Sequence, residues 1–497
     1  MQNQIILSGS GGGKGSSSTP REASDNLKSQ SFANILLAIS EGPIAGFVDN
    51  SNWFKSIYLD GTPIVSAIGY QNFKEVEAHL RFGLPDQDPI QGFTRLKSEI
   101  PVDVEVKQAN PIVRTIVDDD ADYAVVRIQT PALFNTDSKG NINGTEIRYL
   151  IELSINGGPY NPVVQGLISG KTSSTYEESQ AIQLPPNPGN RWDIKVSRIT
   201  ADSTTIKLQN SLRWASYQVV QKETKTFPNV ALLALRINSQ QFTSVPSVAI
   251  YQRGIACRIP NNYDPIHRTY IGNFDGSLRS YWTNNPAWIL WTALTNDRWG
   301  CGIPESELDV WSFYEAARYC DELVPSVGSQ VEPRYSFNAY LNSSQDAFDL
   351  IGQIASSMRA QVWWNGSRIV LSQDRPTPVA RMFSPSHVVY QYDEEGRMTG
   401  GGFQYVSTDL STRYTSVVVR YLNPQTWEED SVLVEDAELI NLWGFRQLEI
   451  TAVGCTSRTQ AERFGRWELY VATKQTEVVS FSLASEGLRE RVTFLRE

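Results

Sequence analysis

The sequence has few residues of the kinds on which most enzyme chemistry depends. Among its 497 residues are only three histidines, and none has a second histidine at the spacing of a metal site. No H-E-x-x-H, G-x-S-x-G or G-x-G-x-x-G motif occurs. Glycoside hydrolysis needs only two carboxylates, and nothing in the sequence selects a pair. We therefore expect no catalytic residue, no cofactor and no metal ligand, and predict that the protein is not an enzyme. We expect the histidines to lie at the surface, or in the core with their ring nitrogens hydrogen-bonded; they are His79, His267 and His387.

Long apolar runs and closely spaced cysteines are also missing. The longest apolar run near the start, residues 32–39, is far shorter than the roughly 18 residues of a membrane helix. The first residues lack the basic region and the long apolar region of a secretory signal. No C-x-x-C pair occurs, so neither a disulfide framework nor a zinc ribbon is indicated. We expect assembly in a cytoplasm, and buried thiols at Cys257, Cys301, Cys320 and Cys455.

Basic residues are outnumbered by acidic ones. Lys+Arg 44 against Asp+Glu 54 gives a net charge of -10, which argues against tight, sequence-independent binding to DNA or to an anionic membrane. The composition is otherwise that of a globular protein, with 40% hydrophobic and 20% charged residues. A chain of this length is too long to fold around one hydrophobic core. At about 150 residues per domain, we expect roughly three domains.

Tryptophans are concentrated between residues 273 and 335. Asn285 and Pro286 begin a predicted helix, because asparagine caps a helix and proline fits its first turn. A second helix is predicted from Ser306 to about Leu323, with Ser306 and Asp309 at capping-box spacing. Apolar residues at helical spacing predict a buried face. We interpret the stretch as a helical clamp built around Trp282, Trp288, Trp291, Trp299 and Trp311.

Three motifs resemble ligand sites and are interpreted otherwise. The Gly/Ser-rich residues 8–19 resemble a phosphate-binding loop, but its glycine and hydroxyl positions hold Ser8 and Gly15, so we predict a flexible arm. Residues 135–144 resemble a calcium loop, but Lys139 stands where an oxygen ligand is required, so we predict a hairpin tip. Consecutive acids in a strand point to opposite faces. A solvated turn is therefore predicted for Asp118, Asp119, Asp120 and Asp122.

The patterning divides the rest of the chain into a β-rich and a mixed part. Alternation of apolar and polar residues dominates residues 102–217 and indicates an antiparallel β module. Two later helices are predicted, at 343–359 with a cap at Ser343 and at 457–473 with a cap at Ser457. Between them, Asn365-Gly366 indicates a tight hairpin. Because strands follow each helix, this last part is predicted to be α+β.

Several sequence blocks are distinctive, and they read GKGSSSTPREASDNLKS, AISEGPIAG, ADSTTIKLQNSLRWASY, GNFDGS, NNPAW, TNDRWG, YCDELVP, SQDRP and AVGCTSRTQAERFGRW. In this order they resemble the tip attachment protein J family of long-tailed phages, also called host specificity protein J. The resemblance runs from about residue 13 to residue 488 and corresponds to the N-terminal baseplate-hub part of the family.

The resemblance implies an α+β, β-rich multidomain fold. It would contain β-barrel domains of the phage tail-hub type, a β insertion module, and helices packed on antiparallel strands. The expected parts are an N-terminal arm (1–30), a hub β domain (31–101), the insertion (102–220), the return of the hub domain (221–272), the tryptophan-rich clamp (273–335), an α+β hub domain (336–485) and a C-terminal tail (486–497).

The resemblance also implies a function in the virion. A homotrimer would form the central hub at the distal end of the tail, close the tail tube, and open for DNA ejection. Its expected partners are the distal tail protein, the tail tip ring proteins and the tape-measure protein, with phage DNA passing through only transiently. Family members continue into receptor-binding parts, whereas this sequence stops at Glu497, so receptor contact is not expected through these residues.

A carbohydrate-binding adhesin of the tail tip is the alternative. Exposed tryptophans stack on sugars as readily as buried ones fill a core. This alternative would require Trp288, Trp291 and Trp311 to form an exposed, coplanar row.

Overall fold

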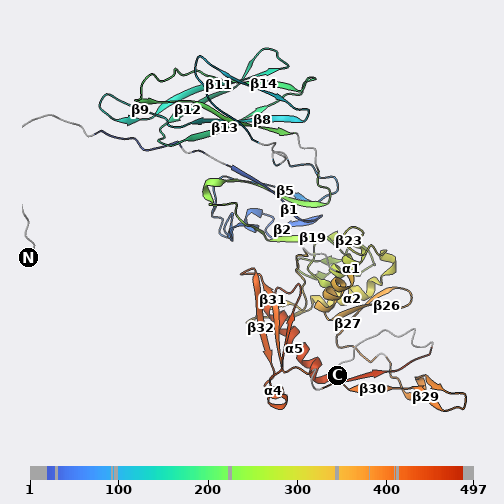
Figure 1. Ribbon diagram of the computed structural model, residues 1–497. Helices are drawn as coiled ribbons and strands as arrows, with labels where there is room; N and C mark the ends of the chain where they lie inside the picture. The colour runs from blue at the N-terminus through green and yellow to red at the C-terminus, as the bar shows by residue number, and fades with distance from the viewer. Residues whose placement is uncertain are drawn as a thin grey trace, which may run out of the picture. The chain divides into compact units, whose positions relative to one another are not determined.

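The computed structural model describes residues 20–484, apart from 28, 30–31, 91–92, 94–98, 222–225, 342–345, 380, 408 and 410–412. The chain forms two compact units, Met1–Gln252 and Arg253–Glu497 (Figure 1). Both are rich in strands, and the α-helices of the described residues all belong to the second unit. The protein is therefore a β-rich, α+β multidomain protein. The sheets of the described residues are all open, so the predicted closure into β-barrels is not seen there.

The first unit contains an antiparallel sheet whose strands are far apart in the sequence. β17 (Val230–Asn238) lies between β1 (Phe32–Glu41) and β5 (Val76–Phe82). One face of this sheet packs on a small sheet of β18 (Val248–Ile250), β3 (Ile57–Leu59) and β4 (Thr62–Pro63). Asp60 and Gly61 connect β3 to β4 with positive φ at both positions, which is the geometry of a tight hairpin turn.

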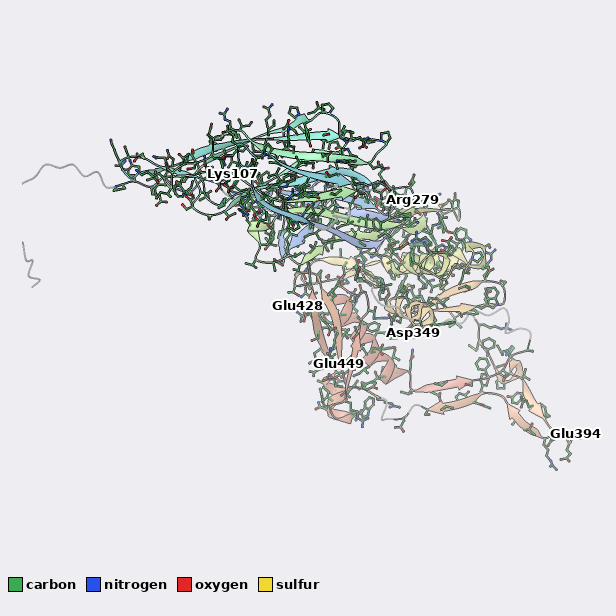
Figure 2. The ribbon with its side chains drawn as sticks, turned by 45° about the horizontal axis from the view of Figure 1, so that its top comes forward. Lys107, Arg279, Asp349, Glu394, Glu428 and Glu449 are labelled. Atoms are coloured by element: carbon green, nitrogen blue, oxygen red, sulfur yellow. The ribbon has the colours of Figure 1, made fainter. Side chains whose placement is uncertain are left out.

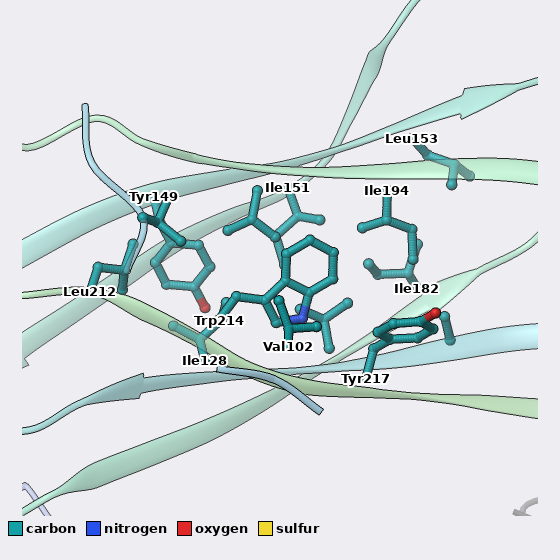
Figure 3. Packing of buried hydrophobic residues seen from close by; sticks show 14 of the residues in the cluster. Val102, Ile128, Tyr149, Ile151, Leu153, Ile182, Ile194, Leu212, Trp214 and Tyr217 are labelled. Atoms are coloured by element: carbon teal, nitrogen blue, oxygen red, sulfur yellow. The ribbon is translucent and has the colours of Figure 1, made fainter. Parts of the chain in front are cut away.

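Between β5 and β17 the chain forms an eight-stranded module. Its two four-stranded sheets have the orders β12-β11-β14-β7 and β13-β8-β16-β6, and their inner faces share one hydrophobic core. Tyr149, Ile151 and Trp214 lie close together in that core (Figure 3). Alternate residues are buried along much of β8 and β11, as the β-type sequence pattern predicted. The strands are β6 (Ile100–Glu105), β7 (Ile112–Val117), β8 (Ala121–Thr130), β11 (Thr145–Ile155), β12 (Asn161–Gly170), β13 (Tyr176–Gln183), β14 (Arg191–Arg198) and β16 (Arg213–Gln221).

The same stretch of chain adds a smaller sheet to these eight strands, made of β9 (Phe134–Thr136), β10 (Ile142–Asn143) and β15 (Leu208–Gln209). The loop between β9 and β10 is the calcium-like stretch, and it is a hairpin tip as predicted. Asp137 caps it by accepting hydrogen bonds from the backbone of Lys139 and Asn141. The acidic residues 118–120 form the turn between β7 and β8, as predicted, whereas the prediction is wrong for Asp122, which lies in strand β8.

One glycine of the module should tolerate no side chain. Gly166 of β12 lies opposite Tyr149 of β11, and a Cβ at position 166 would lie 2.0 Å from the tyrosine Cζ. The ring is fixed because the Tyr149 hydroxyl is hydrogen-bonded to Glu178 and, at 3.0 Å, to Gln180. We expect Gly166→Ala to lower the free energy of unfolding by about 1–3 kcal/mol, measured by denaturant titration of module tryptophan fluorescence.

A matched glycine substitution serves as the control for that measurement. Gly352 lies inside helix α3 (Ala347–Ser357), and a Cβ there would meet nothing within 4 Å. Gly352→Ala should therefore stabilise its helix by about 0.5–1 kcal/mol. Equal destabilisation by both substitutions would contradict the steric explanation.

One part of the second unit is helical. Helices α1 (Pro286–Thr295), α2 (Val310–Asp321) and α3 pack together with the hairpin of β26 (Ala360–Trp364) and β27 (Ile369–Gln373). The Asn365-Gly366 hairpin is confirmed, with Gly366 at positive φ. The first cap is also confirmed, whereas the second helix begins at Val310 and not at Ser306. Ser306 lies in a 3-10 turn (Glu305–Glu307), and Asp309 precedes α2 without a side-chain capping bond.

The remaining part of the second unit places helix α5 (Arg458–Lys474) against a three-stranded sheet. In that sheet β31 (Ser416–Asn423) lies between β32 (Glu428–Glu435) and β33 (Gln447–Thr451). Ser457 caps α5 by accepting a hydrogen bond from the Gln460 backbone, as predicted. Glu428 and Glu449 project from the exposed parts of this sheet (Figure 2). Helix α4 (Ala437–Trp443), capped by Asp436, was not predicted from the sequence.

Short strands complete the described structure. Helix α3 is capped by Asp346; the predicted cap, Ser343, lies outside the described residues, as does the motif at residues 8–19. The remaining strands are β2 (Ile44–Phe47), β19 (Gln252–Ile255), β20 (Cys257–Pro260), β21 (Tyr263–Asp264), β22 (Thr269–Tyr270), β23 (Leu278–Tyr281), β24 (Leu323–Pro325), β25 (Val331–Pro333), β28 (Tyr390–Tyr392), β29 (Met398–Gly401), β30 (Gln404–Ser407) and β34 (Glu477–Ser480).

Candidate functional site

The tryptophans of α1 form the centre of the helical part. Trp288 and Trp291 are 0% and 1% exposed, and their rings meet edge to face with centroids 6.3 Å apart. Trp291 also meets Phe313 of α2 edge to face at 5.1 Å. Such ring pairs add to the stabilisation from burial. We call Trp288, Trp291 and Phe313 the aromatic core.

The other tryptophans of the stretch are less buried. Trp299 packs against the same hydrophobic cluster, and Trp282 lies under the guanidinium of Arg253 at 5.4 Å. Trp311 is 49% exposed, and it meets Phe274 edge to face at 5.1 Å. The hydrophobic cluster of the predicted clamp therefore contains Trp288, Trp291 and Trp299 but neither Trp282 nor Trp311, and position 311 falls on the outer side of α2.

A buried side-chain network connects both helices to the β21–β22 hairpin. Asp321, at the end of α2, accepts hydrogen bonds from Arg268, from the Tyr270 hydroxyl at 2.7 Å and from the Asn285 side chain at 2.9 Å. Arg268 and Asp321 are 9% and 8% exposed. Burial raises the pKa of Asp321, and the Arg268 guanidinium opposes the rise. We call these residues the Asp321 network.

Asn285 explains why this network holds the two helices together. Its side-chain oxygen caps α1 by accepting a hydrogen bond from the Ala287 backbone at 3.0 Å. Its side-chain nitrogen donates to the Ala317 carbonyl of α2 at 2.9 Å, as well as to Asp321. A single fully buried side chain therefore begins one helix and ties it to the other.

The arrangement of these residues suits a rigid joint. The carboxylate of Asp321 is paired with a guanidinium and with tyrosine and amide donors, which is how proteins satisfy a buried charge. Glycoside hydrolysis requires two facing carboxylates. The Arg268 side chain donates hydrogen bonds to Asp321, to the Ser336 hydroxyl and to the Tyr335 carbonyl, so one carboxylate is found among these three partners. The network therefore provides stability without an identifiable reacting pair.

The three histidines are all exposed. His267 is hydrogen-bonded to Asp264 at 2.7 Å, His79 meets Phe93 edge to face, and His387 closes a capping box with Ser384. Among the residues that the structure describes, no group of three or more His, Cys, Asp or Glu side chains could hold a metal ion.

Three of the four cysteines are buried, as predicted, and Cys301 is exposed. Burial raises the pKa of the Cys257 and Cys320 thiols to about 12 and that of Cys455 to about 11. Thiols with such values carry almost no thiolate at neutral pH and are poor nucleophiles. The prediction of a buried thiol at position 301 is wrong because Cys301 lies in the turn after α1.

No helix in the described part of the chain has the length and apolar character needed to cross a bilayer.

Comparison with known proteins decides the family. The chain is 33% identical over 489 residues to the tip attachment protein J of Escherichia phage SECphi27, covering 98% of this chain and 40% of that protein. It is likewise 33% identical over 485 residues to the tip attachment protein J of Escherichia phage SECphi4, covering 97% of this chain and 42% of that protein. The chain belongs to the tip attachment protein J family. It spans about two fifths of the length of these relatives.

Two family models match separate parts of the chain. The model of the tip attachment protein J FNIII-A domain matches residues 96–223, which contain the eight-stranded module, and the model of a putative phage tail protein matches residues 346–493. The aromatic core lies between the two ranges, within the stretch aligned to the J proteins. A solved structure titled "CBM4 structure and function" covers 31% of this chain and 77% of its own at 7% identity and a TM-score of 0.13, too low a similarity to carry any argument.

Proposed function

We propose that the chain is a structural protein at the distal end of a phage tail, where it forms the central hub of the tail tip. In this role it would close the tail tube and take part in tail assembly and DNA ejection. The observation that carries the proposal is the alignment of nearly the whole chain with two phage tip attachment proteins J. The virion is then its location, and the host cytoplasm its site of assembly.

The interior of the second unit supports a mechanical role. The aromatic core and the Asp321 network fix α1, α2 and the β21–β22 hairpin to one another through buried contacts. Buried aromatic side chains and satisfied buried charges resist deformation because separating them exposes apolar area and unpaired charge. A hub that holds its shape while DNA leaves the tail would need such joints.

The assembly that we propose is a homotrimer. Its partners would be the distal tail protein, the tail tip ring proteins and the tape-measure protein, and phage DNA would pass through it only transiently. The net charge of -10 per chain supports the last point, since Lys and Arg contacts with phosphate supply most non-specific affinity for DNA. Receptor contact is proposed to lie outside these residues.

Electron microscopy of assembled tails tests the proposal. We expect gold-labelled antibodies against this chain to mark the distal end of the tail, and tails from phage that lack the chain to be absent or open at that end. Label along the tube or on the capsid would refute the position, and a monomer in detergent-released tail tips would refute the trimer.

The structure provides no support for the adhesin alternative. Trp288 and Trp291 are buried, so the exposed row of three tryptophans that this function would require is not present.

A further inference from the structure

The first described residues of the chain run along the eight-stranded module. We call residues 20–27 and 29 the strap. The Ala23 backbone donates a hydrogen bond to the Ile142 carbonyl at 2.9 Å, and the Ile142 backbone donates to the Arg21 carbonyl at 2.9 Å, so the strap pairs with β10. Further along, the Asn26 backbone donates to the Lys171 carbonyl at 3.1 Å. These bonds resemble those of an extended peptide added to the edge of a sheet.

The charges of the strap complement one buried lysine. The Lys171 side chain is 3% exposed, and its ammonium contacts Glu22 at 2.8 Å and Asp25 at 2.6 Å. Its third side-chain partner is the Ser173 hydroxyl at 3.2 Å. Asp25 is held in turn by the Ser173 backbone, which donates to it at 3.0 Å. Both carboxylates that neutralise Lys171 therefore come from the strap.

The side chains that follow also have defined places. The Asn26 side chain accepts a hydrogen bond from the Lys171 backbone at 2.7 Å, and Leu27 packs against the hydrophobic core of the module. Gly170 makes room for both residues, because a Cβ at position 170 would lie 2.6 Å from the Asn26 oxygen and 2.8 Å from Leu27 Cγ. Finally, the Ser29 hydroxyl accepts from the Glu177 backbone at 2.8 Å.

We propose that the module carries a binding site for an extended acidic peptide of the pattern Glu-x-x-Asp-Asn-Leu, and that the strap of the same chain is its resident ligand. The site recognises charge at Lys171, backbone at Ile142, and an apolar side chain beside Gly170. This inference does not depend on the proposed function. It means that the module is attached at a third point besides the two chain connections at its ends.

The contacts distinguish a binding site from incidental packing. The strap precedes the module in the chain by the whole of β1 to β5, so no local connection forces the two together. Backbone pairing, charge pairing and side-chain insertion all occur within one short peptide. Within the described residues, removal of the strap would take both anions away from the Lys171 ammonium and leave the Ser173 hydroxyl as its side-chain hydrogen-bond partner.

Peptide binding to a truncated chain tests the proposal. The chain lacking residues 1–29 is mixed with a fluorescein-labelled peptide of residues 20–29, and fluorescence anisotropy is recorded. We expect saturable binding to the truncated chain and none to the full chain, whose site is occupied. The peptide with Glu22→Gln and Asp25→Asn should bind about tenfold more weakly, because it loses both ion pairs with the Lys171 ammonium.

Two lysine variants of the truncated chain separate the site from general electrostatics. Lys171→Met should reduce peptide affinity by more than about tenfold. Lys195→Met, which removes an ion pair between β14 and β11 that does not involve the strap, should leave the affinity unchanged. Fluorescence of the buried Trp192 and Trp214 reports whether each variant keeps a folded module. Absence of peptide binding by a folded truncated chain would overturn the proposal, as would equal binding by truncated and full chains.

Limited proteolysis gives a second measurement in the full chain. Arg21 is held through its backbone nitrogen, which donates to Asn141 at 2.8 Å, and through its carbonyl. Trypsin should therefore cleave after Arg21 slowly in the unmodified chain and at least about tenfold faster in Lys171→Met, because cleavage follows the population of the open form. Equal cleavage rates in the two proteins would contradict the proposal that the strap binds to the module of its own chain.

Discussion

Replacement of Trp291 by alanine is expected to lower the free energy of unfolding of the second unit by about 3–5 kcal/mol. The side chain is 1% exposed and contacts Trp288 and Phe313, so its removal leaves a cavity between α1 and α2 that the neighbouring rings cannot fill. Calorimetry of the purified chain measures the loss. Assembled tails containing this variant should be few or absent if the proposed hub function holds.

Trp311 provides the matched control for that substitution. It belongs to the same stretch and also contacts aromatic rings, but half of its surface is exposed. Trp311→Ala should therefore lower the free energy of unfolding by about 1 kcal/mol, from the loss of a partly buried contact. Similar losses for Trp291→Ala and Trp311→Ala would show that the aromatic core does not carry the stability assigned to it.

Asp321→Ala is expected to have an effect of similar size for an electrostatic reason. The substitution leaves the buried Arg268 guanidinium without its carboxylate and removes the acceptor for Tyr270 and Asn285. Breaking one side of a buried ion pair typically costs about 3–5 kcal/mol. Urea titration of the purified chain at neutral pH measures the effect.

A double substitution distinguishes a lost charge pair from lost packing. Arg268→Met combined with Asp321→Leu removes both charges at similar volume, and such replacements are often neutral. We expect the double variant to be more stable than Asp321→Ala alone, because no unpaired charge remains. A loss equal to the sum of the two single substitutions would mean that the pair contributes through packing and not through charge compensation.

The sequence was most informative where a local rule determines the structure. Asn285 with Pro286, Ser457 before α5, and the Asn365-Gly366 turn were all predicted, because capping bonds and tight turns depend on residues a few positions apart. Ser306 misled the prediction for the same reason. It has capping-box spacing to Asp309, but the backbone between them forms a 3-10 turn, and α2 begins only at Val310.

The buried networks could not be predicted, because their members are far apart in the chain. Arg268 and Asp321 each look like ordinary surface residues in the sequence, and only the packing of a hairpin on two helices buries them together. Lys171 and the strap present the same problem over a longer separation. Likewise, helical spacing indicated that α2 buries one face, but it could not show that Trp311 falls outside that face.

The pairing of β1 with β17 has a consequence for synthesis of the protein. Phe32 of β1 is opposite Asn238 of β17, so the apolar strand FANILLAISE leaves the ribosome long before its partner exists. In the described part of the chain, the strands of the module pair with one another and, at β10, with the strap, which is synthesised earlier. Ile100 near the entry of the module lies opposite Tyr217 near its exit, so the module can fold during that interval. Once folded, the module holds the two ends of the intervening chain close together and shortens the loop that β1 and β17 must close. Until then β1 is an unpaired apolar edge, the state in which nascent chains aggregate or recruit chaperones.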